Sequence, residues 1–92
     1  MIIDITELFT IQHKAMASVL DWLDHHVGTY IGPGTGFCDN LYIDGHRDSV
    51  LHIGQGWQIS AVDYVDGYGH TMIYELDITN DKLATFFILK FL

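Results

Sequence analysis

The spacing of apolar residues changes once along the chain, from a helical period to a period of two. Residues 5–27 carry apolar side chains three or four positions apart, the spacing of one helix face. These side chains are Ile5, Leu8, Phe9, Ala15, Met16, Val19, Leu20, Leu23 and Val27. Asp4 and Glu7 have capping-box spacing, and Gly28 suits the residue after a helix. The pattern predicts one long helix at about residues 5–27, apolar on one side, with a break near Thr10 as an alternative.

The next segment, at about residues 28–40, is rich in glycine and reads GTYIGPGTGFCDN. A phosphate-binding glycine loop follows a strand, opens a helix and in its commonest form ends in Lys-Ser or Lys-Thr. Here the glycines follow the predicted helix, precede a strand and lack the lysine. We therefore predict a connecting loop with a tight turn at Pro33 and Gly34.

From residue 41 the apolar residues alternate with polar ones, as in half-buried strands. The segments are separated by GHR, GQG and DGY, which have hairpin chemistry, and then by TNDK. One set of cross-strand pairs places most of the apolar side chains on one face and most of the polar ones on the other: Ile43 with Ser49, Ile53 with Trp57, and Val65 with His70. Asp63 is the exception on that face. The pattern predicts an antiparallel meander over about residues 41–91.

Residues 81–92 fit either a last strand or a short helix capped by Asn80 or Thr79. The threonine, phenylalanine and isoleucine content favours the strand. The predicted fold is therefore α+β: one long N-terminal helix packed on a four- or five-stranded antiparallel meander sheet, in a single domain spanning residues 1–92.

The balance of charge narrows the class of partner. The chain has twelve Asp and Glu residues but only four Lys and Arg residues, which gives a formal net charge of −8. Such a chain repels nucleic-acid backbones and acidic membranes, so we expect neither direct nucleic-acid binding nor membrane binding. A basic protein is the expected partner, such as a nucleic-acid-binding enzyme. The alternative is that the charge serves only solubility.

The remaining composition indicates a cytoplasmic protein. A single cysteine cannot form an internal disulfide, so a disulfide-stapled secreted fold is excluded. The N-terminal residues show no basic segment followed by an apolar run, and no apolar stretch approaches the roughly 18 residues of a membrane span.

The sequence evidence for catalytic and metal-binding residues is weak. A nucleophilic Cys38 would need a lowered pKa and a histidine base, but no family signature surrounds it and the negative charge of Asp39 opposes a thiolate. The chain has six histidines. A metal site built from Asp24, His25 and another histidine is conceivable, although His25 and His26 would point about 100° apart on a helix. We predict no cofactor and no metal ion.

Acid–base chemistry needs paired carboxylates in a pocket, and two pairs are candidates. They are Asp44 with Asp48 and Glu75 with Asp77. No pattern marks a pocket around either pair, so we interpret them as surface acids. We therefore predict no catalytic residue and a protein that is not an enzyme.

The polar face of the predicted sheet is the most informative feature, because apolar residues lie at its centre and acids surround them. An apolar centre with a polar rim is typical of protein interfaces. The predicted partner-binding residues are Tyr42, Asp44, Asp48, Val62, Tyr64, Ile73, Glu75 and Asp77.

These observations predict a small acidic binding protein that blocks or regulates a basic protein surface, as a monomer or a weak homodimer. Its composition is similar to that of phage-type inhibitors of host nucleic-acid enzymes, such as anti-restriction and anti-CRISPR proteins that mimic nucleic acid. The first alternative is a homodimeric structural or accessory protein that uses the same face on itself. The second is a small metal-dependent or ligand-binding enzyme that uses its histidines.

Overall fold

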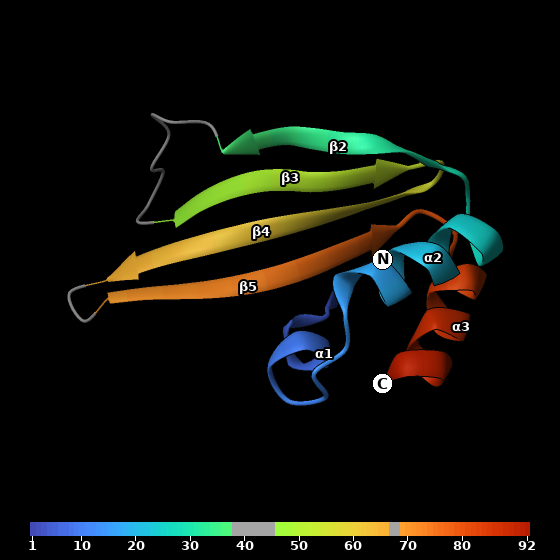
Figure 1. Ribbon diagram of the computed structural model, residues 1–92, viewed down its shortest axis with the longest axis horizontal. Coiled ribbons are helices and arrows are strands. Elements are labelled where there is room, and N and C mark those ends of the chain that lie inside the picture. The colour runs from blue at the N-terminus through green and yellow to red at the C-terminus, as the bar shows by residue number, and fades with distance from the viewer. Residues whose placement is uncertain (38–45, 67–68) are drawn as a thin grey trace.

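The protein is built around one five-stranded antiparallel sheet. The computed structural model describes residues 1–37, 46–66 and 69–92. The strands are β1 (Ile2–Asp4), β2 (Tyr30–Phe37), β3 (His46–Gly54), β4 (Trp57–Asp66) and β5 (Gly69–Ile78), in the order β1-β5-β4-β3-β2. The helices are α1 (Thr6–Thr10), α2 (Met16–His26) and α3 (Asp81–Phe91). Figure 1 shows the three helices gathered at one end of the sheet. The predicted sheet range of 41–91 is wrong at both ends, because β1 and β2 precede residue 41 and the last strand, β5, ends at Ile78.

The prediction of a single long helix over residues 5–27 is wrong. The chain forms α1 and α2, separated by a turn in which His13 adopts a left-handed φ of 54°. The N–H groups of Ile11 and Gln12 both donate to the carbonyl of Glu7, which closes the end of α1. Asp4 belongs to β1, and its Oδ1 accepts from the N–H of Thr6 at 2.9 Å instead of forming the predicted capping box. The alternative of a break near Thr10 is correct, because α1 ends at that residue. The series of apolar side chains listed above also lapses there, between Phe9 and Ala15.

The prediction of a glycine-rich loop over 28–40 is wrong for residues 30–37, which form the edge strand β2. Glycine is needed there because β2 approaches β3 closely. A Cβ atom added at Gly34 would lie 2.0 Å from the carbonyl oxygen of Val50. The pairing with β3 is irregular, with register shifts on both sides of Pro33. Residues 38–40 lie outside the described part of the chain.

The predicted register holds for one hairpin and fails for another. Val65 pairs with His70 in the β4–β5 hairpin, as predicted. In the β3–β4 hairpin, however, Trp57 pairs with Gly54 instead of Ile53. A register shift at Leu51 absorbs the extra residue, because a bulge places two residues of one strand against one of the other. His52 therefore faces the helices and Ile53 faces away from them. The predicted pair Ile43–Ser49 lies partly outside the described residues.

The core lies between the helices and one face of the sheet. Its sheet residues include Trp57, Ile59, Leu76 and Ile78, all nearly inaccessible to solvent. The helices contribute Leu8, Val19, Leu23, Ala84 and Phe87.

The prediction that residues 81–91 form a strand is wrong, and the helical alternative is correct. The side chain of Asn80 caps α3 by accepting from the N–H groups of Lys82 and Leu83, at 3.0 and 3.1 Å. Packing of Ala84 and Phe87 into the core outweighs the strand propensity of the segment.

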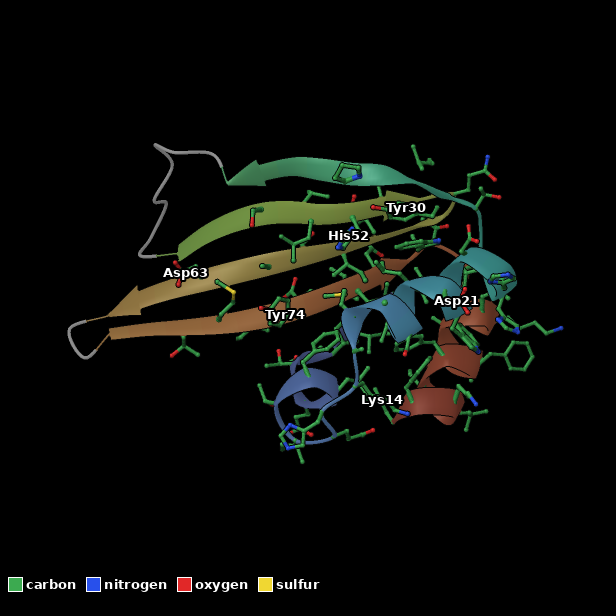
Figure 2. All side chains as sticks on the ribbon, in the orientation of Figure 1. Lys14, Asp21, Tyr30, His52, Asp63 and Tyr74 are labelled. Carbon is green, nitrogen blue, oxygen red and sulfur yellow. The ribbon has the colours of Figure 1, made fainter. Side chains whose placement is uncertain are left out.

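The β4–β5 hairpin extends well beyond the helices, as Figure 1 shows. Residues past Ala61 on β4 and before Tyr74 on β5 form this extension, which we call the arm. Asp63 lies on the arm and is 5% exposed (Figure 2). Its pairing with Met72 places it on the same face of the sheet that the helices cover nearer the core. None of the helices in residues 1–37, 46–66 and 69–92 is long and apolar enough to cross a membrane.

Candidate protein-binding face

The face of the sheet opposite the helices, called the outer face below, carries the candidate site. The cross-strand pairs fix its membership, because residues directly opposite each other share a face. The pairs are Ile2–Asp77, Asp4–Glu75, Gln58–Asp77, Ser60–Glu75, Val62–Ile73 and Ile53–Gln58. Four of the predicted binding residues are therefore brought together here: Val62, Ile73, Glu75 and Asp77.

The other four predicted binding residues are less defined. Asp48 is paired with Val62 and Tyr64 with Thr71, so both occupy backbone positions of the outer face. The structure describes no side chain at either position. Tyr42 and Asp44 lie outside the described residues.

The apolar part of the outer face differs from the prediction. Val62 is only 6% exposed, so it supports the sheet and offers little surface to a partner. Ile73 and Ile53 are half-buried, whereas Ile2 is 66% exposed. The accessible apolar surface therefore lies beside Val62 and not on it.

The acids of the outer face crowd one another. Asp4 of β1 lies directly opposite Glu75 of β5, and Asp77 follows two residues later on the same face. Like charges in opposite positions on neighbouring strands destabilise a sheet. The negative charge of Asp77 is partly offset by the Met1 amino group, whose nitrogen lies 3.6 Å from Asp77 Oδ1.

No side-chain cation balances these acids on the outer face within the described residues. Lys14 lies between α1 and α2, and Lys82 and Lys90 belong to α3. Arg47 is paired with Asp63, a position that belongs to the opposite face. The outer face thus concentrates negative charge while the lysines are held in the helical layer.

A shallow hollow of about 250 Å³ opens at the end of the outer face near the β3–β4 turn. It is lined by Ile53, Gly54, Gly56, Trp57, Gln58, Asp77 and Thr79. An isoleucine and a carboxylate on one hollow match the two parts of a lysine or arginine side chain, an apolar stem and a cationic tip.

Sequence reasoning missed Ile2, Asp4 and Ile53 as members of this face. Ile2 and Asp4 lie on a strand of three residues, too short for alternation to be visible. Asp4 also matched a helix-capping pattern, which concealed its strand position. Ile53 was assigned to the wrong face because the bulge at Leu51 has no sequence signal.

A second cluster of polar side chains ties α2 and β2 to the sheet. Tyr30 and His52 lie together in Figure 2, with the Tyr30 hydroxyl 3.0 Å from His52 Nδ1. Asp24 accepts from the N–H of Tyr30, and the Trp57 indole donates to the carbonyl of Gly28 at 2.7 Å. Every named group has a partner within the protein, so the cluster is explained by the fold.

The predicted metal candidates are not assembled in the described part of the chain. No group of three or more His, Cys, Asp or Glu side chains is placed there to hold a metal ion. His25 instead contacts Asp21, whose carbonyl lies 2.7 Å from His25 Nδ1. That hydrogen bond, followed by the Asp21 carboxylate, raises the pKa of His25 above 6.5. Cys38 lies outside the described residues.

Comparisons with protein-family models, curated proteins and solved structures found no match.

Proposed function

We propose that the protein is a non-enzymatic binding protein whose acidic outer face docks on a basic surface of another protein. The observation that carries the proposal is the group of acids Asp4, Glu75 and Asp77, which no described side-chain cation balances, on a sheet face that no described helix covers. A basic partner would place positive charge beside Asp4 and Glu75, which occupy opposite positions on neighbouring strands.

The class of partner follows from this charge. A nucleic-acid-binding enzyme presents a basic cleft to phosphates, and an acidic sheet face can occupy such a cleft in place of nucleic acid. Inhibition of such an enzyme, in the manner of anti-restriction or anti-CRISPR proteins, is the specific form of the proposal. A cytoplasmic location, expected from the single cysteine, belongs to the same proposal.

The test is affinity capture with two matched triple variants. The face variant carries Asp4→Asn, Glu75→Gln and Asp77→Asn. The control variant carries Glu7→Gln, Asp21→Asn and Asp81→Asn, which neutralises the same number of acids on the helical side. Proteins retained by the wild type are identified by mass spectrometry. Their isoelectric points are compared with those of proteins retained by each variant.

We expect basic proteins to be retained by the wild type and the control variant and lost by the face variant. The retained fraction should fall as salt rises from about 0.05 M to about 0.5 M, because exposed charges are screened. Equal loss from both variants would show that net charge alone is responsible, and equal retention by all three would refute the proposal.

A single apolar substitution separates docking from general charge attraction. Ile73 is half-buried on the outer face, so Ile73→Arg adds a cation there without entering the helical core. We expect partner binding to be abolished with the fold intact. A tight dimer at low salt that Ile73→Arg dissociates would instead favour a homodimer using this face.

A further inference from the structure

The edge of β5 along the arm is left without a partner strand. β1 pairs with β5 only at Glu75, Leu76 and Asp77. Beyond these residues, Ile5 donates to the carbonyl of Tyr74, and the N–H of Tyr74 donates to Thr6 Oγ1, both at 2.9 Å. The chain then turns into α1, and no described strand continues along residues 69–73 of β5.

The direction of the free backbone groups follows from the alternation of the ladder. In an antiparallel sheet, the N–H and C=O groups of successive residues point to opposite neighbouring strands. Ile78 and Tyr74 use theirs on the side away from β4, since Ile78 donates to Met1 and Tyr74 bonds to Ile5 and Thr6. Met72, two residues earlier, must therefore direct its N–H and C=O to the open edge. No described residue pairs with them there.

The two edges of the sheet differ in how well they are protected against pairing with another strand. Edge strands that pair with no other chain are usually protected by proline, bulges or lysine. β2, the opposite edge, has Pro33 and two register shifts. The open part of β5 pairs regularly with β4 throughout and contains no proline, lysine or arginine. Figure 1 shows this edge running free along the arm, beyond α1.

We propose that this edge receives an extended, basic segment of the partner protein as an added strand, an inference that rests on the proposed function. Such a strand would gain main-chain hydrogen bonds to Met72 and place its side chains alternately on the two faces. On the outer face they would lie near Ile73 and Glu75. On the other they would lie beside Met72, which is 37% exposed, and Tyr74.

The chemistry of the two faces defines the segment. The acids Asp4 and Glu75 at the end of the open edge favour lysine or arginine on the outer side. Met72 and the Phe9–Tyr74 ring pair, with centroids 5.3 Å apart, favour apolar residues on the other side. A second copy of the chain fits less well, because each copy carries a net charge of −8.

The probe is a fluorescent peptide of about ten residues, the length of a long strand, in which lysine and valine alternate. A peptide of alternating glutamate and valine is its control. The test variant is Met72→Pro, which removes the N–H at the open edge while leaving the hydrogen bonds to β4 in place. Met72→Ala is the matched control, because it shortens the same side chain and keeps the N–H.

We expect the lysine–valine peptide to bind the wild type and Met72→Ala similarly and Met72→Pro about tenfold more weakly, in line with the loss of one hydrogen bond. The glutamate–valine peptide should not bind. Hydrogen exchange at the Met72 amide of the wild type should slow at least about tenfold on saturation, while exchange at Ile73, which already bonds to β4, stays unchanged. The exchange measurement decides the matter even if Met72→Pro fails to fold.

Two results would overturn strand addition by a partner protein, and a third would overturn only the proposed function. Equal binding to both Met72 variants, with binding lost in the face variant, would mean attraction by charge alone, and the proposed function would stand. If exchange at Met72 slows but the face variant still retains all the basic proteins that the wild type retains, strand addition would stand and the proposed function would be refuted. Dissociation of a dimer by Met72→Pro, with no peptide binding, would identify a second copy as the occupant.

Discussion

Replacing Gly34 by alanine should destabilise the protein strongly, whereas the same change at Gly32 should not. The Cβ atom introduced by Gly34→Ala would lie 2.0 Å from the Val50 carbonyl oxygen and 2.5 Å from its carbon, well inside the 3.0 Å that Cβ contacts respect. Both atoms are backbone, so no side chain can rotate away. At Gly32 an added Cβ meets no atom within 4 Å, and neither glycine has a positive φ.

The magnitude follows from the displacement that the clash requires. Strands lie about 4.8 Å apart, so moving β2 outward by about 1 Å breaks the neighbouring hydrogen bonds. Loss of about two such bonds at about 1 kcal/mol each, together with residual crowding, gives about 3 kcal/mol. The lower entropy of the unfolded alanine chain returns about 0.5 kcal/mol. The free energy of unfolding should fall by about 2–3 kcal/mol, and the Tm by about 10–20 °C for a chain of this size.

The assay is urea unfolding followed by tryptophan fluorescence, with thermal unfolding as a second measurement. Trp57 packs against Tyr30 of β2, with ring centroids 6.1 Å apart, so its fluorescence should report on the loosening of this strand. Gly32→Ala should match the wild type or exceed its stability by a few tenths of a kcal/mol. If Gly34→Ala is as stable as Gly32→Ala, then β2 does not pair closely with β3 and residues 30–37 would return to the predicted loop.

Two further predictions concern the helix ends. The raised pKa of His25 means that its protonation stabilises the folded chain below pH 6.5, and this stabilisation is lost as the pH rises through the raised value. Asp21→Asn removes one of the causes, so an NMR titration should show the pKa of His25 falling in that variant and unchanged in Asp81→Asn; no difference between the two would refute the assigned cause. Asn80→Ala should lower the free energy of unfolding by about 1 kcal/mol, because two N–H groups of α3 lose their acceptor. Asn80→Asp should retain the wild-type Tm, and equal losses in both variants would show that the cap is not responsible.

The β4–β5 hairpin was predictable because two independent signals agree on it. The segment DGYG requires a turn, and the alternation on both sides of it fixes which residues face the core. The neighbouring β3–β4 hairpin has equally good turn residues at Gln55 and Gly56, yet its register was predicted wrongly. Leu51 and Ile53 are both apolar and two positions apart, so alternation is satisfied whether or not a bulge separates them.

The helical and glycine-rich regions were mispredicted because tertiary contacts outweigh local signals. The break between α1 and α2 was predicted only as an alternative near Thr10, and it includes His13 in a left-handed conformation that few residues other than glycine adopt. β2 has the composition of a loop, but glycine at position 34 allows its backbone to lie close to that of β3. In residues 81–91, intrinsic strand propensity favoured the wrong element, while the Asn80 capping signal favoured the observed helix.

The candidate site depends on the same tertiary pairings, which explains why only part of it was predictable. Glu75 and Asp77 could be assigned to one face by alternation, but their repulsion with Asp4 arises only because β1 pairs with β5. The shortness of β1 has a second effect: a strand of three residues crowds acids at one end of β5 and leaves the rest of its edge unpaired. A longer β1 would cover Met72 and remove the open edge while leaving the acids in place. The acidic face and the free edge are therefore separable by mutation, and a partner that needs both must carry basic side chains on an extended segment.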